Sequence, residues 1–88
     1  MKIHIRVESM KAAEHLSAIC KEFSEEMYLR SDKFCIDPKS TLGILAMMYS
    51  ARDCMYLDTG DLEDKDIPKL LRAIDGFIVK EPSEKPAP

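Results

Sequence analysis

The stretch Lys39-Ser40-Thr41-Leu42-Gly43-Ile44-Leu45-Ala46-Met47-Met48 is the part of this sequence that says most about the fold. It follows Asp37-Pro38, so a short polar segment precedes an almost unbroken apolar run. Proline lacks an amide hydrogen and biases the residue before it away from helix. We therefore expect a strand to end at Asp37 and a short helix to run from Ser40 to about Tyr49. Serine is favoured at the N-cap of such a helix, and the apolar remainder must be packed or bound.

The residues before this helix fall into three patterned segments. Residues 2–7 alternate apolar with polar side chains, which predicts a half-buried strand. Residues 10–25 place apolar side chains at steps of three and four, which predicts a helix with Ser9 at its N-cap. The short runs 27–30 and 34–36 are rich in aromatic or apolar residues and indicate a β-hairpin.

The residues after this helix predict one more strand and one more helix. Residues 53–58 alternate less cleanly and are expected to form a fourth strand that ends at Thr59-Gly60. The acidic residues 61–66 then lead to a helical apolar stripe that begins at Ile67 and that Gly76 is placed to terminate. The element order is strand, helix, strand, strand, helix, strand, helix. It predicts an α+β fold in which helices stack on one face of an antiparallel sheet.

Length and composition predict one small domain. The chain has 88 residues, of which 45% are hydrophobic, enough for a single core. We assign residues 1–79 to this domain. Residues 80–88 carry three prolines and no large apolar side chain, so we expect a disordered tail.

Charge and hydropathy argue against several classes of partner. The net charge is −3 and the basic residues are scattered, so we expect no nucleic-acid partner. No window reaches the roughly 18 uncharged apolar residues of a membrane span, and the start of the chain lacks the apolar block of a signal peptide. We therefore expect a cytoplasmic protein without a membrane partner.

Neither the cysteines nor the acidic residues have the spacing of a metal site. Cys20, Cys35 and Cys54 are far apart and odd in number, so we expect them to be small buried hydrophobes. His4 has no second imidazole or thiol at ligand spacing, and the acidic residues 58–66 do not match a calcium loop. We predict no metal, no cofactor and no enzymatic activity.

The element order and the segment Lys39-Ser40-Thr41-Leu42-Gly43-Ile44-Leu45-Ala46-Met47 resemble the HPr family. This family comprises the histidine-containing phosphocarriers of the bacterial phosphoenolpyruvate-dependent sugar phosphotransferase system. In its Gram-positive members the matching segment reads Lys-Ser-Ile-Met-Gly-Val-Met-Ser-Leu, and the resemblance extends to about Ile78. It implies an HPr-like open-faced β-sandwich, in which four antiparallel strands carry three helices on one face.

The resemblance also shows where this chain departs from the family. Members carry the phosphate on a histidine at the N-cap of the first helix, usually within Leu-His-Thr-Arg-Pro-Ala. That histidine aligns with Ser9, the arginine with Lys11 and the proline with Ala12. A serine phosphoester would be a dead end for onward transfer, so we expect no carrier function.

The family's second site is retained. Gram-positive members are phosphorylated by HPr kinase/phosphorylase on a regulatory serine at the start of the second helix, which aligns with Ser40. Serine is also favoured there as a plain N-cap, and the two roles can coexist. The family's partner-docking patch aligns with Thr41, Leu42 and Leu45. Catabolite-repression HPr-like proteins similarly lack the histidine and keep the serine.

These features predict a regulatory or binding module whose second helix contacts a protein partner, either HPr kinase/phosphorylase or a transcriptional regulator. Two alternatives stay open. One is a residual phosphocarrier that uses His4, His15 or Ser9 as an unconventional acceptor. The other is a scaffold subunit of a larger assembly.

Overall fold

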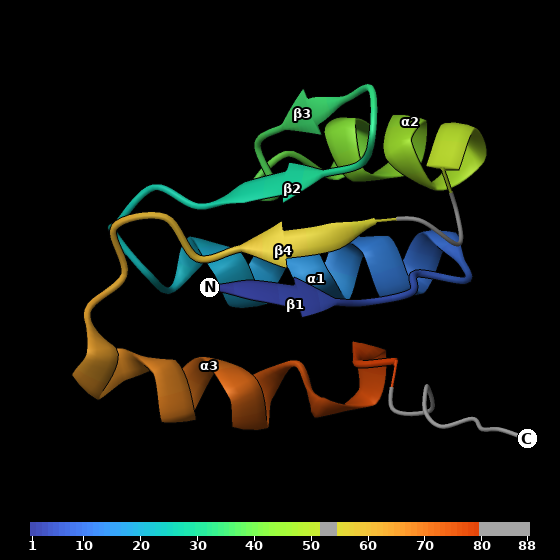
Figure 1. Cartoon of the computed structure of the whole chain (residues 1–88). Coiled ribbons are helices and arrows are strands. Elements are labelled where there is room, and N and C mark those ends of the chain that lie inside the picture. Colours follow the sequence, from blue (N-terminus) through green and yellow to red (C-terminus); the bar gives the residue numbers. More distant parts are fainter. Residues whose placement is uncertain (52–54, 80–88) are drawn as a thin grey trace, which may run out of the picture.

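The computed structural model describes residues 1–51 and 55–79 of the chain. Within these residues the fold is α+β, with a four-stranded antiparallel sheet and three α-helices packed on one face of it (Figure 1). The predicted fold class is therefore confirmed. The tail expected at residues 80–88 and residues 53 and 54 of the expected fourth strand lie outside the described residues.

The sheet consists of four short strands: β1 (Lys2–His4), β2 (Tyr28–Arg30), β3 (Cys35–Ile36) and β4 (Tyr56–Asp58). Their order is β1-β4-β2-β3, so β4 and β2 are central. The register aligns Ile3, Leu57 and Leu29 in one row across the three paired strands, and all three are buried. Their neighbours in the strands are half-buried or exposed, because successive side chains point to opposite faces. One face of the sheet thus joins the core and the other stays open.

The strand predicted over residues 2–7 is shorter than expected. Regular pairing ends at His4, and beyond it the chain makes single hydrogen bonds to other segments. Ile5 forms an isolated bridge with Ile78, and the Arg6 amide donates to the Phe77 carbonyl at 2.8 Å. The alternation of residues 2–7 nevertheless predicted correctly which side chains are buried. Ile5 and Val7 are buried although they do not belong to a continuous strand.

The helices are α1 (Met10–Lys21), α2 (Thr41–Ala51) and α3 (Ile67–Ala73), with 3₁₀ turns at Asp64–Asp66 and Asp75–Phe77. α1 is shorter than the predicted residues 10–25. The amides of Glu22 and Phe23 bond to carbonyls three residues back, which tightens and closes the helix.

The prediction that Gly76 terminates the third helix is wrong. α3 ends at Ala73, and Gly76 lies inside the following 3₁₀ turn. Among the described residues, Gly60 is the one glycine with a positive φ, at 59°. It follows β4, where the chain turns toward the acidic segment.

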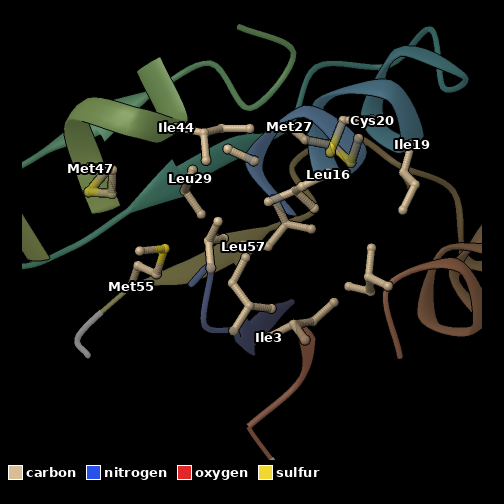
Figure 2. Packing of buried hydrophobic residues seen from close by; sticks show 14 of the residues in the cluster. Ile3, Leu16, Ile19, Cys20, Met27, Leu29, Ile44, Met47, Met55 and Leu57 are labelled. Atoms are coloured by element: carbon tan, nitrogen blue, oxygen red, sulfur yellow. The ribbon is translucent and has the colours of Figure 1, made fainter. Parts of the chain in front are cut away.

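The core lies between the sheet and the helices (Figure 2). α1 contributes Leu16 and Cys20, and α2 contributes Ile44, Met47 and Met48. Methionine fills irregular gaps well because its thioether side chain is unbranched and flexible. α2 thus has a buried side, which leaves its opposite side for other contacts.

The expectation that the cysteines are buried holds for one of the two that the structure describes. Cys20 is buried, and this burial raises the pKa of its thiol to about 11. Cys35 is exposed on the edge strand β3, so that prediction was wrong for it. β3 is an edge strand of the sheet, with β2 as its strand neighbour. Cys54 lies outside the described residues.

Candidate functional site

Ser40 lies at the N-terminus of α2, where its side chain caps the helix. Its Oγ accepts a hydrogen bond from the Gly43 amide at 3.1 Å, and its carbonyl accepts from the Ile44 amide at 3.0 Å. The first bond satisfies one of the amides that a helix start leaves without an intrahelical partner. The residue is exposed, so its hydroxyl is both held in place and open to solvent.

The loop before Ser40 is fixed by local hydrogen bonds. The Asp37 carboxylate accepts from the Lys39 amide at 2.9 Å, and the Asp37 carbonyl accepts from the Ser40 amide at 3.0 Å. Pro38 between them is buried. An aspartate that bonds the backbone two residues on forms an Asx turn, which sets the direction of the chain entering α2.

A second set of bonds ties this loop to α1 and to the segment after it. The Ser17 hydroxyl, which is buried within α1, donates to the Lys39 carbonyl at 2.8 Å. The Lys39 ammonium donates to the Glu25 carbonyl at 3.1 Å. The start of α2 is therefore held against α1 by a polar contact inside an otherwise apolar interface.

Ser17 did not emerge from the sequence as a functional residue. It lies four residues after Ala13 and three before Cys20, both of which are buried on the same side of α1. A lone serine within an apolar helical stripe needs a hydrogen-bond partner once it is buried. That pattern was the available signal, but it does not say where the partner lies.

The outward side of α2 is apolar and exposed. Leu42 is 79% exposed and Tyr49 is 80% exposed, and Ala46 between them is exposed as well. Of the predicted docking residues, Leu42 is the most accessible, while Thr41 and Leu45 are half-buried. The structure thus adds Ala46 and Tyr49 to this surface. Their positions four and seven residues after Leu42 place them on the same side of a helix, which was a signal in the sequence.

Ser9, which aligns with the family's carrier histidine, caps α1. Its Oγ accepts a hydrogen bond from the Ala12 amide at 3.1 Å, and Lys11 is exposed beside it. Together with Arg6 and Phe77, Ser9 lines an open groove of about 660 Å³ between the helix start and the C-terminal segment. The groove holds a serine hydroxyl and no imidazole among its lining residues, so the described site lacks a histidine that could carry phosphate.

Neither histidine lies at the start of α1, where Ser9 lines the groove. His4 lies on the open face of the sheet, with its ring centroid 5.9 Å from that of Tyr56. His15 lies in the middle of α1 and is exposed, with its ring centroid 5.8 Å from that of Phe77. Neither occupies a helix N-terminus, the position that favours a phosphoryl group electrostatically.

The open face of the sheet carries charged and aromatic side chains that contact one another. Arg30 Nε lies 3.2 Å from Asp58 Oδ2, and its guanidinium lies 5.0 Å from the centroid of the Tyr28 ring. The Gly60 amide and the Arg30 side chain lower the pKa of Asp58. A hydrogen bond to Glu26 raises the pKa of Tyr28. On this face the charges of Arg30 and Asp58 therefore pair with each other.

In residues 1–51 and 55–79, no three side chains among His, Cys, Asp and Glu come together as metal ligands. No helix in that part of the chain is long and apolar enough to cross a membrane.

Comparison with known proteins does not place the chain in a family. No protein-family model, no curated protein and no solved structure matches it. The features of the chain that bear on its function are therefore the fold, Ser40 and the outward side of α2.

Proposed function

We propose that this protein is an HPr-like regulatory module related to the bacterial sugar phosphotransferase system, which binds a protein partner through α2 and is controlled by phosphorylation of Ser40. It has no carrier chemistry of its own and acts in the cytoplasm. The observation that carries the proposal is an exposed, positioned serine hydroxyl directly before a helix whose outward side is exposed and apolar.

The position of Ser40 favours a phosphate. Phosphorylation adds up to two negative charges, and the N-terminus of a helix stabilises negative charge. The Gly43 amide, which now donates to the Ser40 hydroxyl, is available to a phosphate oxygen at the same place. The modified residue would offer strong acceptors for a basic side chain of a partner.

The position of the docking surface supports coupling between modification and binding. Leu42 lies two residues after Ser40 and is the most exposed of the predicted docking residues. A charge placed at Ser40 therefore lies beside the apolar contact. It would favour a partner that carries arginine or lysine there and oppose one that is apolar or acidic.

The experiment is phosphorylation of the purified chain by HPr kinase/phosphorylase with ATP, followed by intact mass and site mapping. We expect one phosphate on Ser40, absent from Ser40→Ala and retained in Ser9→Ala. Ser9 is a matched control because it is also an exposed serine at a helix N-cap. Absence of phosphate, or phosphate on another residue, would overturn the regulatory role of Ser40.

A second assay separates this role from carrier chemistry. The chain is incubated with phosphoenolpyruvate and the general phosphotransferase enzyme, and the stability of any phosphate is measured in acid and base. We expect no transfer. A phosphate that is labile to acid and stable to base would indicate a histidine acceptor and favour the residual phosphocarrier instead.

A further inference from the structure

Lys39, the residue directly before Ser40, is held by three hydrogen bonds that use three different groups. Its amide donates to the Asp37 carboxylate at 2.9 Å, and its carbonyl accepts from the Ser17 hydroxyl at 2.8 Å. Its ammonium donates to the Glu25 carbonyl at 3.1 Å, in the segment between α1 and β2. The chain therefore enters α2 from a residue that is fixed at its backbone and at the end of its side chain.

Ser17 differs from the other two partners of Lys39. Asp37 belongs to the same loop, and Glu25 offers a backbone carbonyl that any residue at its position would offer. Ser17 offers a side chain that is 1% exposed and lies on α1, next to the buried Leu16. A buried hydroxyl is costly without a partner, so the pairing with the Lys39 carbonyl is strongly favoured over an open arrangement. Ser17 is thus the buried side chain that ties α1 to this loop.

The first turn of α2 is also held from the side of β3. A Cβ built on Gly43 would lie 3.3 Å from Ile36 Cδ1 and 3.5 Å from the Asp37 carbonyl oxygen, so the helix start and the end of β3 are in close contact. The Gly43 amide donates to Ser40 Oγ at 3.1 Å. Ser40 accordingly lies between a fixed residue before it and a fixed turn after it.

These contacts set the direction of the Ser40 hydroxyl. The bond from the Gly43 amide uses one acceptor position of Oγ, which leaves a second lone pair and the hydroxyl proton. In phosphorylation by ATP, Oγ forms the bond to the γ-phosphorus, ADP leaves, and the hydroxyl proton goes to a base of the kinase. A hydroxyl that already points in one direction loses less entropy when it enters such an arrangement.

We propose that Ser17 is a positioning residue for the phosphorylation of Ser40, an inference that deepens the proposed function and rests on it. Its hydroxyl holds the Lys39 carbonyl and thereby keeps the start of α2 in the arrangement that the kinase binds. Ser17 does not touch the phosphoryl group. It sets the fraction of molecules in which Ser40 is presented correctly. The apparent affinity of the kinase for the chain falls with that fraction, so loss of the bond raises KM and leaves kcat unchanged.

Steady-state phosphorylation of the full chain by HPr kinase/phosphorylase with ATP tests this role. We expect Ser17→Ala to raise the KM for the chain about fivefold, the factor typical of one hydrogen bond, with kcat unchanged. An unchanged KM, or a loss confined to kcat, would overturn the positioning role.

A core variant separates positioning from a general loss of stability. Ile3→Val removes a buried methyl group from β1, which lies at one edge of the sheet, whereas β3 beside α2 lies at the other. This substitution destabilises the fold without a change near Ser40, so we expect the kinetic constants of the wild type. An equal rise in KM for Ile3→Val and Ser17→Ala would show that KM follows overall stability, and it would contradict the proposal.

Amide hydrogen exchange of the isotopically labelled full chain measures the positioning without the kinase. The Gly43 amide donates to Ser40 Oγ, and the Ile44 amide donates to the Ser40 carbonyl at 3.0 Å. We expect both amides to exchange about fivefold faster in Ser17→Ala than in the wild type. The Ile74 amide, which donates to the Leu70 carbonyl at 3.0 Å at the end of α3, is the internal control and should not change. Unchanged exchange near Ser40, or an equal rise at Ile74, would argue against the role of Ser17.

The failure of this inference can be told apart from the failure of the proposed function. A wild-type chain that receives no phosphate on Ser40 overturns the proposed function, and the role of Ser17 in the modification falls with it. A wild-type chain that is phosphorylated on Ser40, with the same KM in Ser17→Ala, leaves the proposed function intact and overturns the role of Ser17 alone.

Discussion

The hydroxyl of Ser17, in the middle of α1, donates a 2.8 Å hydrogen bond to the carbonyl oxygen of Lys39, 22 residues further along the chain. Lys39 directly precedes Ser40, so this bond holds the start of α2 against α1. The serine is 1% exposed, and the contact is a polar bond among apolar neighbours. The candidate phosphosite is thus positioned by a residue from another helix.

We expect Ser17→Ala to lower the free energy of unfolding by about 1–3 kcal/mol, because it removes a buried hydrogen bond. Urea denaturation followed by circular dichroism gives the value. Ser24→Ala, at an exposed serine, serves as the matched control and should change the stability by less than about 0.5 kcal/mol. Equal stability of both variants would show that the Ser17 bond does not hold the helices together.

The turn after β4 can be tested by an alanine substitution at Gly60, with the same substitution at Gly76 as the control. Gly60 has φ of +59°, and a Cβ built there would lie 2.4 Å from the Glu26 carbonyl oxygen, which belongs to the backbone and cannot move cheaply. We expect Gly60→Ala to cost more than about 2 kcal/mol, from left-handed backbone strain and this overlap together. Thermal unfolding of the purified variant measures the loss.

Gly76→Ala is the control for this substitution. A Cβ at Gly76 meets nothing within 4 Å, and its φ is not positive. We expect a change between zero and a gain of about 1 kcal/mol, because alanine restricts the unfolded chain more than glycine does. A loss at Gly76 as large as that at Gly60 would contradict the geometric explanation.

The Asp58 carboxylate makes the free energy of unfolding depend on pH in the acid range. Its pKa is lowered by the Gly60 amide and by Arg30, so folding favours the charged form. The stabilisation is present above the ordinary aspartate pKa of about 3.9 and is lost as the pH falls through the lower pKa of the folded state. Urea denaturation of the wild type and Asp58→Asn at pH 7, 4 and 2 measures this effect.

We expect Asp58→Asn to be less stable than the wild type at pH 7, and the two to converge toward pH 2. Asparagine keeps an oxygen for the Gly60 amide and lacks the charge that faces Arg30, so it isolates the ionised state. Stability curves that stay parallel from pH 7 to pH 2 would rule out a contribution from the Asp58 charge.

The cysteines should differ in reactivity. Burial raises the pKa of Cys20 to about 11, so only about one thiol in a thousand is ionised at pH 8. Cys35 is exposed. With iodoacetamide at pH 8 and peptide mapping, we expect rapid labelling of Cys35 in the native protein and labelling of Cys20 only after addition of denaturant. Native labelling of both at the same rate would show that Cys20 is not protected.

Local patterns predicted most of the secondary structure. The alternation of residues 2–7, the helical spacing of residues 10–25 and the serines at the two helix starts depend on neighbours within a few positions. Ser9 and Ser40 both cap their helices as expected, each through a bond to an amide three residues on. The element order that followed from these patterns was enough to predict the α+β fold class.

Long-range contacts decided the parts that the sequence left open. Almost every residue of α2 is apolar, so its hydrophobic periodicity could not say which side would be buried; the fold buries Ile44 and leaves Leu42 in solvent. Cys20 and Cys35 are the same residue type, yet one lies under the sheet and the other at its edge.

Local patterns were enough to predict which segments form helices and strands and that a serine precedes α2, because these features depend on chemistry within one or two turns of the chain. The folded structure alone shows that Ser17 bonds to Lys39 and that Leu42 and Tyr49 lie in solvent. Both depend on which elements pack together, and that outcome is set by contacts between residues far apart in the sequence.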